Sequence, residues 1–102
     1  MEYDKTGAIV VYKVYIIQSS ANGRFYCGQS DDLNRRLIQH NDSDYRGSLT
    51  TKRFPGPWKL VWSESHETRS SAMHRERQIK KRGIGRFLEG LSLKEIRNGN
   101  DI

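Results

Sequence analysis

The chain has 102 residues, the size of a single domain, and a formal net charge of +6 that favours a polyanionic partner such as nucleic acid. A basic balance also occurs in small proteins that bind no nucleic acid, so charge alone does not decide the partner. Cys27 is the only cysteine, which excludes an internal disulfide and a cysteine-based zinc centre.

The first elements are predicted to be a polar lead-in and a β-hairpin. We expect residues 1–9 to be flexible. This segment has no apolar leader, and no run of about 18 apolar residues follows it, so we expect a cytoplasmic protein without a membrane partner. The β-branched and aromatic residues 10–17 indicate a strand, and residues 24–28 indicate its returning partner. The turn signal at residues 19–23 joins them into a hairpin.

A helix and a long loop are expected next. Residues 30–32, Ser-Asp-Asp, are typical of a helix start. Leu33 and Leu37 form an apolar pair four residues apart, which predicts a helix of about three turns ending near His40. Residues 41–57 contain glycine, proline and basic residues without a clear period, so we interpret them as a long basic loop.

The rest of the chain predicts one more strand and two helices. Residues 58–63 indicate the strand, residues 68–83 a capped helix, and residues 86–91 a short third helix. The order β-β-α-β-α-α predicts an α+β domain, a small three-stranded antiparallel sheet flanked by helices. We expect this domain to span residues 10–91 and residues 92–102 to form a C-terminal tail.

Tyr15 and Tyr26 are predicted to lie on one face of the hairpin. A four-residue loop at residues 19–22 places them opposite each other, and a two-residue turn at residues 22–23 shifts the pairing but keeps them on one face. A three-residue loop separates them. The alternative to a functional role is a cross-strand pair that only packs.

Arg36 and His40 are predicted to share one face of the first helix. They lie four residues apart and flank its apolar stripe, whereas Arg35 and Gln39 point to the opposite side. This placement lets both reach a site on the sheet. The alternative is that the arginine extends along apolar surface to water and the histidine is stabilised by the helix dipole.

Glu76 interrupts the apolar stripe predicted for the second helix. Ala72, Met73 and Ile79 define that stripe, and Glu76 falls in its middle. A carboxylate in such a place is unfavourable unless it is paired or binds a cation, and Mg²⁺ is typically held by one or two carboxylates. The alternatives are an ion pair with Lys80, four residues on, or with the arginine of the first helix.

Basic residues that could follow a phosphate backbone occur in the long loop and on the second helix. A charged run on a helix is more often a solvated face, but the two sets together indicate a nucleic-acid surface. The candidates are Arg46, Lys52, Arg53, Arg75, Lys80 and Lys81.

Several of these segments together resemble the GIY-YIG endonuclease superfamily, in particular its small stand-alone bacterial members. The resemblance spans roughly residues 10 to 90. The first family signature corresponds to residues 13–15, Lys-Val-Tyr, and the second to residues 26–28, Tyr-Cys-Gly. Both tyrosines and the final glycine match. The further matching segments are Asp32-Leu33-Asn34-Arg35-Arg36-Leu37, His40-Asn41 and the run His74-Arg75-Glu76-Arg77-Gln78-Ile79-Lys80-Lys81.

The resemblance implies a metal-dependent endonuclease that hydrolyses a phosphodiester bond in one step. It implies that Glu76 holds one Mg²⁺ or Mn²⁺ and that Tyr15 is the general base, with His40 helping to accept its proton. Arg36 and Tyr26 would orient and neutralise the phosphate. We therefore expect a structure-selective DNA endonuclease of repair or recombination, with RNA as an alternative substrate.

Two other functions stay open. One is a non-catalytic nucleic-acid-binding module with the same fold, and the other is a basic subunit that docks on a larger partner. The presence of all five chemical side chains favours the nuclease, because a degenerate module would more often have lost the glutamate or the arginine.

Overall fold

The computed structural model of the protein describes residues 1–42, 44–45 and 56–91. Its elements, in chain order, are β1 (Glu2–Tyr3), β2 (Ile9–Val10), β3 (Tyr12–Ser19), β4 (Phe25–Ser30), α1 (Leu33–Asn41), β5 (Trp58–His66) and α3 (Arg69–Arg82). Residues 84–91 are also helical. No helix in this described part is long and apolar enough to cross a membrane.

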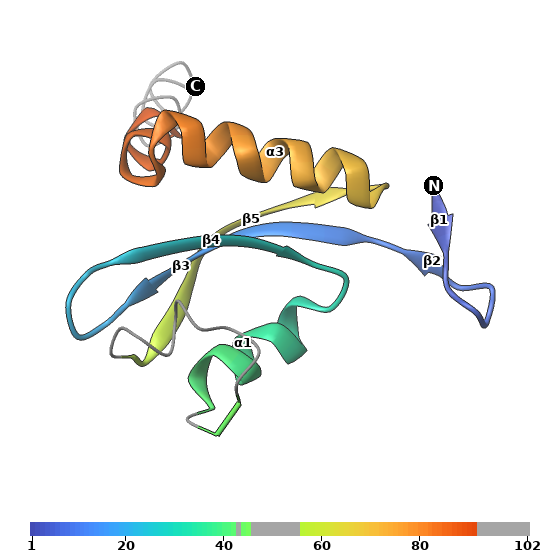
Figure 1. Ribbon diagram of the computed structural model, residues 1–102, viewed down its shortest axis with the longest axis horizontal. Helices are drawn as coiled ribbons and strands as arrows, with labels where there is room; N and C mark the ends of the chain where they lie inside the picture. The colour runs from blue at the N-terminus through green and yellow to red at the C-terminus, as the bar shows by residue number, and fades with distance from the viewer. Residues whose placement is uncertain (43, 46–55, 92–102) are drawn as a thin grey trace, which may run out of the picture.

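The main sheet has the strand order β4-β3-β5, and both pairings are antiparallel. α3 lies over one face of the sheet and α1 over the other (Figure 1). This confirms the predicted α+β fold, a three-stranded antiparallel sheet flanked by helices. A strand covered on both faces must be apolar on both, which explains why β3 reads as a nearly unbroken apolar run.

The alternating side chains of β3 divide between two cores. Val14 and Ile16 pack on the α3 side with Ala72 and Ile79. Tyr15 lies in the other core, together with Ile17, Trp58 and the partly buried Tyr26, Leu33 and Leu37. Alternation along β3 therefore places Tyr15 on the α1 side of the sheet.

The hairpin of β3 and β4 pairs Tyr15 with Gly28 and Ile17 with Tyr26. The two tyrosines thus lie on one face, as alternation predicts, but they are diagonal neighbours and not directly opposite. The loop occupies residues 20–23, one position later than the four-residue loop considered from the sequence. The Ser19 amide donates to the Arg24 carbonyl oxygen at 2.8 Å, and Gly23 has a positive φ of 76° that favours glycine.

The predicted helix caps occur in the structure. The Asp32 side chain accepts a hydrogen bond from the Arg35 amide at 3.1 Å at the start of α1. The Thr68 hydroxyl accepts from the Ser71 amide at 3.1 Å at the start of α3, and Gly83 ends that helix with a φ of 100°. The third strand is longer than predicted, because β5 continues to His66.

A second sheet, β1 paired with β2, precedes the main sheet in the chain and, except for Val10, falls in residues 1–9, for which the sequence predicts no secondary structure. The Asp4 carboxylate accepts hydrogen bonds from the Thr6 and Ala8 amides at 2.8 and 3.1 Å, which closes the turn between the strands. Strands of two residues are too short to produce a recognisable alternation, so pattern analysis does not detect them.

Candidate active site

Three aromatic side chains from β3, β4 and α1 meet on the α1 side of the sheet. Tyr15 Oη and His40 Nε2 are 2.8 Å apart, and these residues are only 1% and 2% exposed. The Tyr26 ring meets the His40 ring edge-on, with centroids 5.0 Å apart, and lies 6.3 Å from the Tyr15 ring. The structure therefore brings together three of the five side chains predicted to do chemistry.

Gly28 makes this arrangement sterically possible. A β-carbon at position 28 would lie 2.8 Å from Tyr15 Oη, closer than β-carbons approach other atoms, and in a tight contact of 3.0 Å with Tyr26 Cε1. The two tyrosine rings therefore lie over Gly28 of β4, which is one of the two edge strands of the described main sheet. This gives a physical reason for the glycine that closes the second signature.

Burial raises the pKa of the Tyr15 phenol well above its ordinary value, and the nearby Tyr26 acts in the same direction. Hydrogen bonding to Arg36 and the charge of its guanidinium oppose these effects without cancelling them. The phenol is therefore protonated near neutral pH. It can donate to His40 when the imidazole Nε2 carries no proton.

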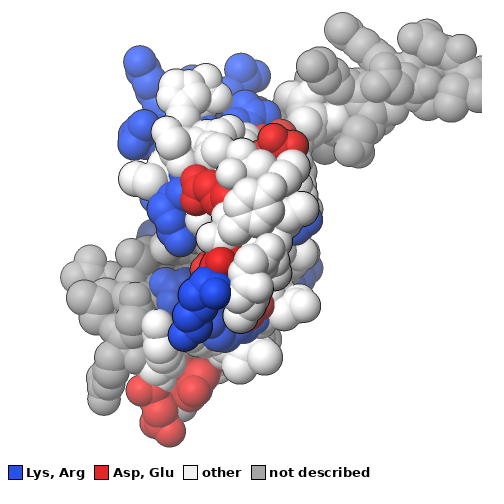
Figure 2. All heavy atoms as spheres, turned by 90° about the vertical axis from the view of Figure 1, so that its right-hand side faces the viewer, with Lys and Arg blue, Asp and Glu red and all other residues white. Residues whose placement is uncertain are grey.

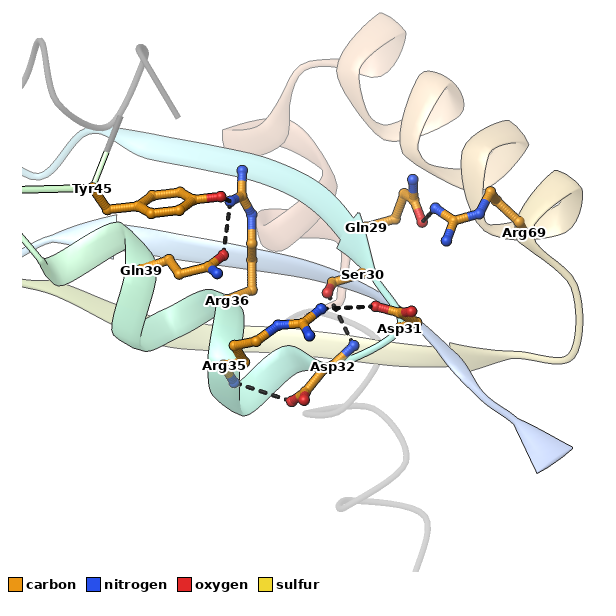
Figure 3. Close-up of polar contacts among 9 residues, drawn as sticks. All are labelled: Gln29, Ser30, Asp31, Asp32, Arg35, Arg36, Gln39, Tyr45 and Arg69. Atoms are coloured by element: carbon orange, nitrogen blue, oxygen red, sulfur yellow. Dashed lines mark hydrogen bonds and ion pairs between the residues drawn. The ribbon is translucent and has the colours of Figure 1, made fainter. Parts of the chain in front are cut away.

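Arg36 lies beside this cluster, partly buried, and its direction is set by two contacts (Figure 3). Its Nη1 donates to Gln39 Oε1 at 3.0 Å and to Tyr45 Oη at 3.3 Å. Burial alone would lower the pKa of the guanidinium. The hydrogen bond with Tyr15 and the electrostatic effects of Tyr15, Tyr26 and Tyr45 together outweigh burial, so the pKa is raised and the group stays a cation.

Gln39 and Tyr45 are two functional candidates that the sequence analysis missed. Gln39 was predicted to point away from the arginine, which is wrong, because residues three apart on a helix are neighbours. That spacing could have identified it. Tyr45 comes after the end of α1, and no local pattern links it to Arg36.

Asn41 fixes the C-terminal end of α1 beside the site. Its Oδ1 accepts from the Trp58 amide at 2.6 Å, and its Nδ2 donates to the Trp58 carbonyl oxygen at 2.9 Å. Trp58 belongs to the same apolar cluster as Tyr15. The asparagine thus ties the turn that carries His40 to the start of β5.

Glu76 lies on the other side of the sheet, in α3. It sits between the buried Ala72 and Ile79, as predicted, whereas Met73 is 42% exposed and does not belong to the buried stripe. The Glu76 side chain is 22% exposed, and its Oε2 is 3.0 Å from Lys80 Nζ. This ion pair is one of the two alternatives foreseen. The described residues contain no ion pair between Glu76 and Arg36.

The negative charge of Glu76 nevertheless affects the pKa values of Tyr15 and Cys27. It adds to burial in raising the pKa of the Tyr15 phenol. At Cys27, burial is the larger cause and the Glu76 carboxylate the second, and together they raise the pKa of the thiol to about 11. Four of the five predicted side chains thus lie on the α1 side of the sheet, and the fifth acts electrostatically from the α3 side.

A divalent ion would depend on few protein ligands here. Within the described residues, no group of three His, Cys, Asp or Glu side chains could hold a metal ion together. Glu76 is a single, partly buried carboxylate, a donor set that suits Mg²⁺ or Mn²⁺ when water and phosphate oxygens complete the coordination.

The candidate nucleic-acid residues of α3 differ in their surroundings. Arg75 Nε lies 3.0 Å from Glu64 Oε1, Lys80 pairs with Glu76, and Lys81 is exposed. Lysine and arginine side chains gather in the upper part of Figure 2, at the height of α3. Arg46, Lys52 and Arg53 lie outside the described residues.

Comparison with known proteins places most of the chain in one family. The model of the GIY-YIG catalytic domain matches residues 11–83. A UPF0213 protein of Staphylococcus epidermidis is 39% identical over 67 residues, which are 66% of this chain and 77% of that protein. A UPF0213 protein of Halobacterium salinarum is 39% identical over 70 residues, 69% of this chain and 86% of that protein.

Among solved structures, the solution NMR structure of the UPF0213 protein BH0048 from Bacillus halodurans is similar. It is 26% identical in sequence, with a TM-score of 0.49, over 82% of this chain and 85% of that one.

Proposed function

The chain belongs to the GIY-YIG catalytic domain family, a nuclease family, and we propose that it is an endonuclease that hydrolyses DNA phosphodiester bonds with a divalent metal ion. Membership of the family confirms the resemblance found in the sequence. The observation that carries the proposal is the cluster of Tyr15, Tyr26 and His40 over Gly28, with Arg36 beside it.

Arg36 and Tyr26 would bind the phosphate that is cut. The guanidinium is a permanent cation whose position is set by Gln39 and Tyr45, so little conformational freedom is lost when it donates to phosphate oxygens. Tyr26 is partly exposed and adds a hydroxyl on the same side. Donors held in place before the reaction stabilise the charge that develops during it.

Tyr15 and His40 would act as one unit in proton transfer. Because the pKa of the phenol is raised, Tyr15 is not an anion in the free protein near neutral pH. It would take a proton from the attacking water only as its own proton moves to His40 Nε2, 2.8 Å away. The pair of Tyr15 and His40 would thus act as the general base, in keeping with the part in accepting the proton that the resemblance implies for His40.

Glu76 would hold the metal ion. When bound, Mg²⁺ or Mn²⁺ polarises the scissile phosphate and stabilises the departing oxygen. Lys80 neutralises the carboxylate in the free protein, so the ion would compete with this exposed lysine for Glu76. Selectivity for branched or nicked DNA and a role in repair or recombination are further parts of the proposal.

The decisive experiment compares the full chain with Glu76→Ala and with the control Glu89→Ala, which removes an exposed carboxylate from the helix of residues 84–91. Branched, nicked and single-stranded DNA would be incubated with Mg²⁺, Mn²⁺ or a chelator. We expect cleavage that the chelator stops, that Glu76→Ala abolishes and that Glu89→Ala retains, with much of the DNA binding preserved in both variants. Metal-dependent cleavage by Glu76→Ala would remove Glu76 from this role.

One observation favours a second candidate, a nucleic-acid-binding module without catalysis. Tyr15 and His40 are almost completely buried, and Glu76 is paired with Lys80 on the other side of the sheet. Binding without cleavage under every metal condition would support this function, and the absence of both binding and cleavage would contradict both candidates.

A further inference from the structure

A basic groove follows the flank of α3 that faces away from Glu76. Two adjoining cavities of about 630 and 340 Å³ share Arg75, Arg82 and Phe87 among their lining residues. We use the name basic groove for the surface formed by Arg75, Gln78, Lys81, Arg82, Phe87 and Gly90.

Helix geometry separates this groove from the proposed metal ligand. Arg75, Gln78 and Arg82 succeed one another at spacings of three and four residues, so they share one flank of α3. The bond from Arg75 to Glu64 places that flank toward β5. Glu76 lies on the other flank, where its charge acts on Cys27 of β4.

The floor of the groove is formed by side chains that contact one another. The Arg75 guanidinium lies over the Phe87 ring at 5.1 Å and is also held by the Glu64 carboxylate at 3.0 Å. The Phe87 ring packs edge-on against Trp62 at 4.9 Å. A β-carbon at Gly90 would lie 3.3 Å from Arg82 Nη2, so the glycine leaves room for the end of this side chain beside the helix of residues 84–91.

The lining of the groove carries an excess of positive charge. It contains three cations and one amide but no carboxylate. Glu64 offsets Arg75, whereas Lys81 and Arg82 are exposed and have no acidic partner in the part of the chain that the structure describes. The negative end of the α3 dipole attracts cations to the last turn, but it does not explain a hollow lined by an amide and opened by a glycine.

Building on the proposed nuclease function, we propose that the basic groove binds the phosphate backbone of the nucleic acid at a second point, away from the bond that is cut. Contacts of this kind set the register of a substrate without reading its bases. An α-helix with its side chains is about 10–12 Å wide, and successive phosphates of one strand are spaced about 3.4 Å along the axis of a duplex. The width of α3 alone therefore requires a substrate that fills both places to extend at least roughly three to four nucleotides beyond the scissile bond.

The test compares the double variant Lys81→Gln/Arg82→Gln with the control Arg77→Gln/Arg86→Gln. The control removes the same charge from exposed arginines that do not line the groove. Binding of a short and a long DNA duplex would be measured by fluorescence anisotropy at several salt concentrations, with a chelator present so that no cleavage occurs. Thermal melting would show that both variants fold.

We expect the groove variant to bind the long duplex about tenfold more weakly and to lower the slope of log affinity against log salt by roughly two, with little effect on the short duplex. If both double variants lost the same DNA affinity for the short and the long duplex, the proposed role of the groove would be contradicted. The proposal would also be contradicted if the protein bound polyglutamate but not DNA and if that binding depended on Lys81 and Arg82. Because cleavage is not measured here, length-dependent binding by a protein that never cuts DNA would support the groove and contradict the nuclease.

Discussion

Tyr15 and His40 form a buried polar pair in which the phenol oxygen lies 2.8 Å from the imidazole Nε2. The two side chains come from β3 and α1, so the bond joins the central strand of the sheet to the helix that covers it. A buried polar pair of this kind is stable only while both partners are present, because an unpaired buried group loses its hydration without compensation.

Tyr15→Phe tests this pair directly. The substitution keeps the ring in the apolar cluster and removes only the oxygen, so we expect the free energy of unfolding to fall by about 1–3 kcal/mol. We also expect loss of cleavage with retained DNA binding, since the proton route to His40 is cut. Tyr3→Phe, at an exposed tyrosine of β1, is the matched control. Full cleavage by Tyr15→Phe would show that the phenol takes no part in the reaction.

Gly28→Ala tests the steric role of the glycine under the tyrosines. The new methyl group would lie 2.8 Å from Tyr15 Oη, and both tyrosines would have to move. Overpacking of this kind typically destabilises by about 1–3 kcal/mol, and we expect reduced cleavage as well. Gly85→Ala is the control, because nothing lies within 4 Å of its β-carbon and the residue is helical. Denaturant titration of both variants checks the prediction. A Gly28→Ala variant as stable as the wild type would contradict it.

Glu2 is expected to make folding stability depend on pH in the acidic range. Hydrogen bonds from the Tyr12 hydroxyl and, second, from the Arg69 amide lower the pKa of its carboxyl below the ordinary value of 4.5. A group with a lowered pKa in the folded state stabilises the protein above its unfolded pKa. That stabilisation is lost as the pH falls through the folded pKa.

Glu2→Gln should therefore lower the melting temperature at neutral pH and weaken its pH dependence below about pH 5. Glu67→Gln, at an exposed carboxylate, is the control. Thermal melts between roughly pH 3 and pH 7 check the difference. Parallel pH profiles for the wild type and Glu2→Gln would contradict the prediction.

Cys27 reports on the position of Glu76 without any measurement of activity. With a thiol pKa of about 11, the native protein should react slowly with thiol reagents at mildly alkaline pH and quickly once unfolded. Glu76→Gln removes a negative charge, so the thiol pKa should fall, and thiolate absorbance should develop at lower pH. Glu89→Gln should leave the titration unchanged. An identical titration in the wild type and both variants would mean that the carboxylate does not act on Cys27.

The amino-acid sequence determined the features that depend on neighbours along the chain. Alternation placed both tyrosines on one side of the hairpin, and the caps Asp32 and Thr68 start the helices where expected. Helical spacing placed Glu76 between Ala72 and Ile79 on the buried side of α3. Each of these follows from the geometry of a single element or a single hairpin.

Only the tertiary structure decided how these elements face one another. It put α1 and α3 on opposite sides of the sheet, so that the helix carrying Glu76 and the cluster around Tyr15 lie on different sides. It also brought Tyr45 to Arg36 and Glu2 to the start of α3. The physical reason is that periodicity specifies which side of its own element a residue occupies, whereas the face that each helix covers depends on packing between segments distant in the chain.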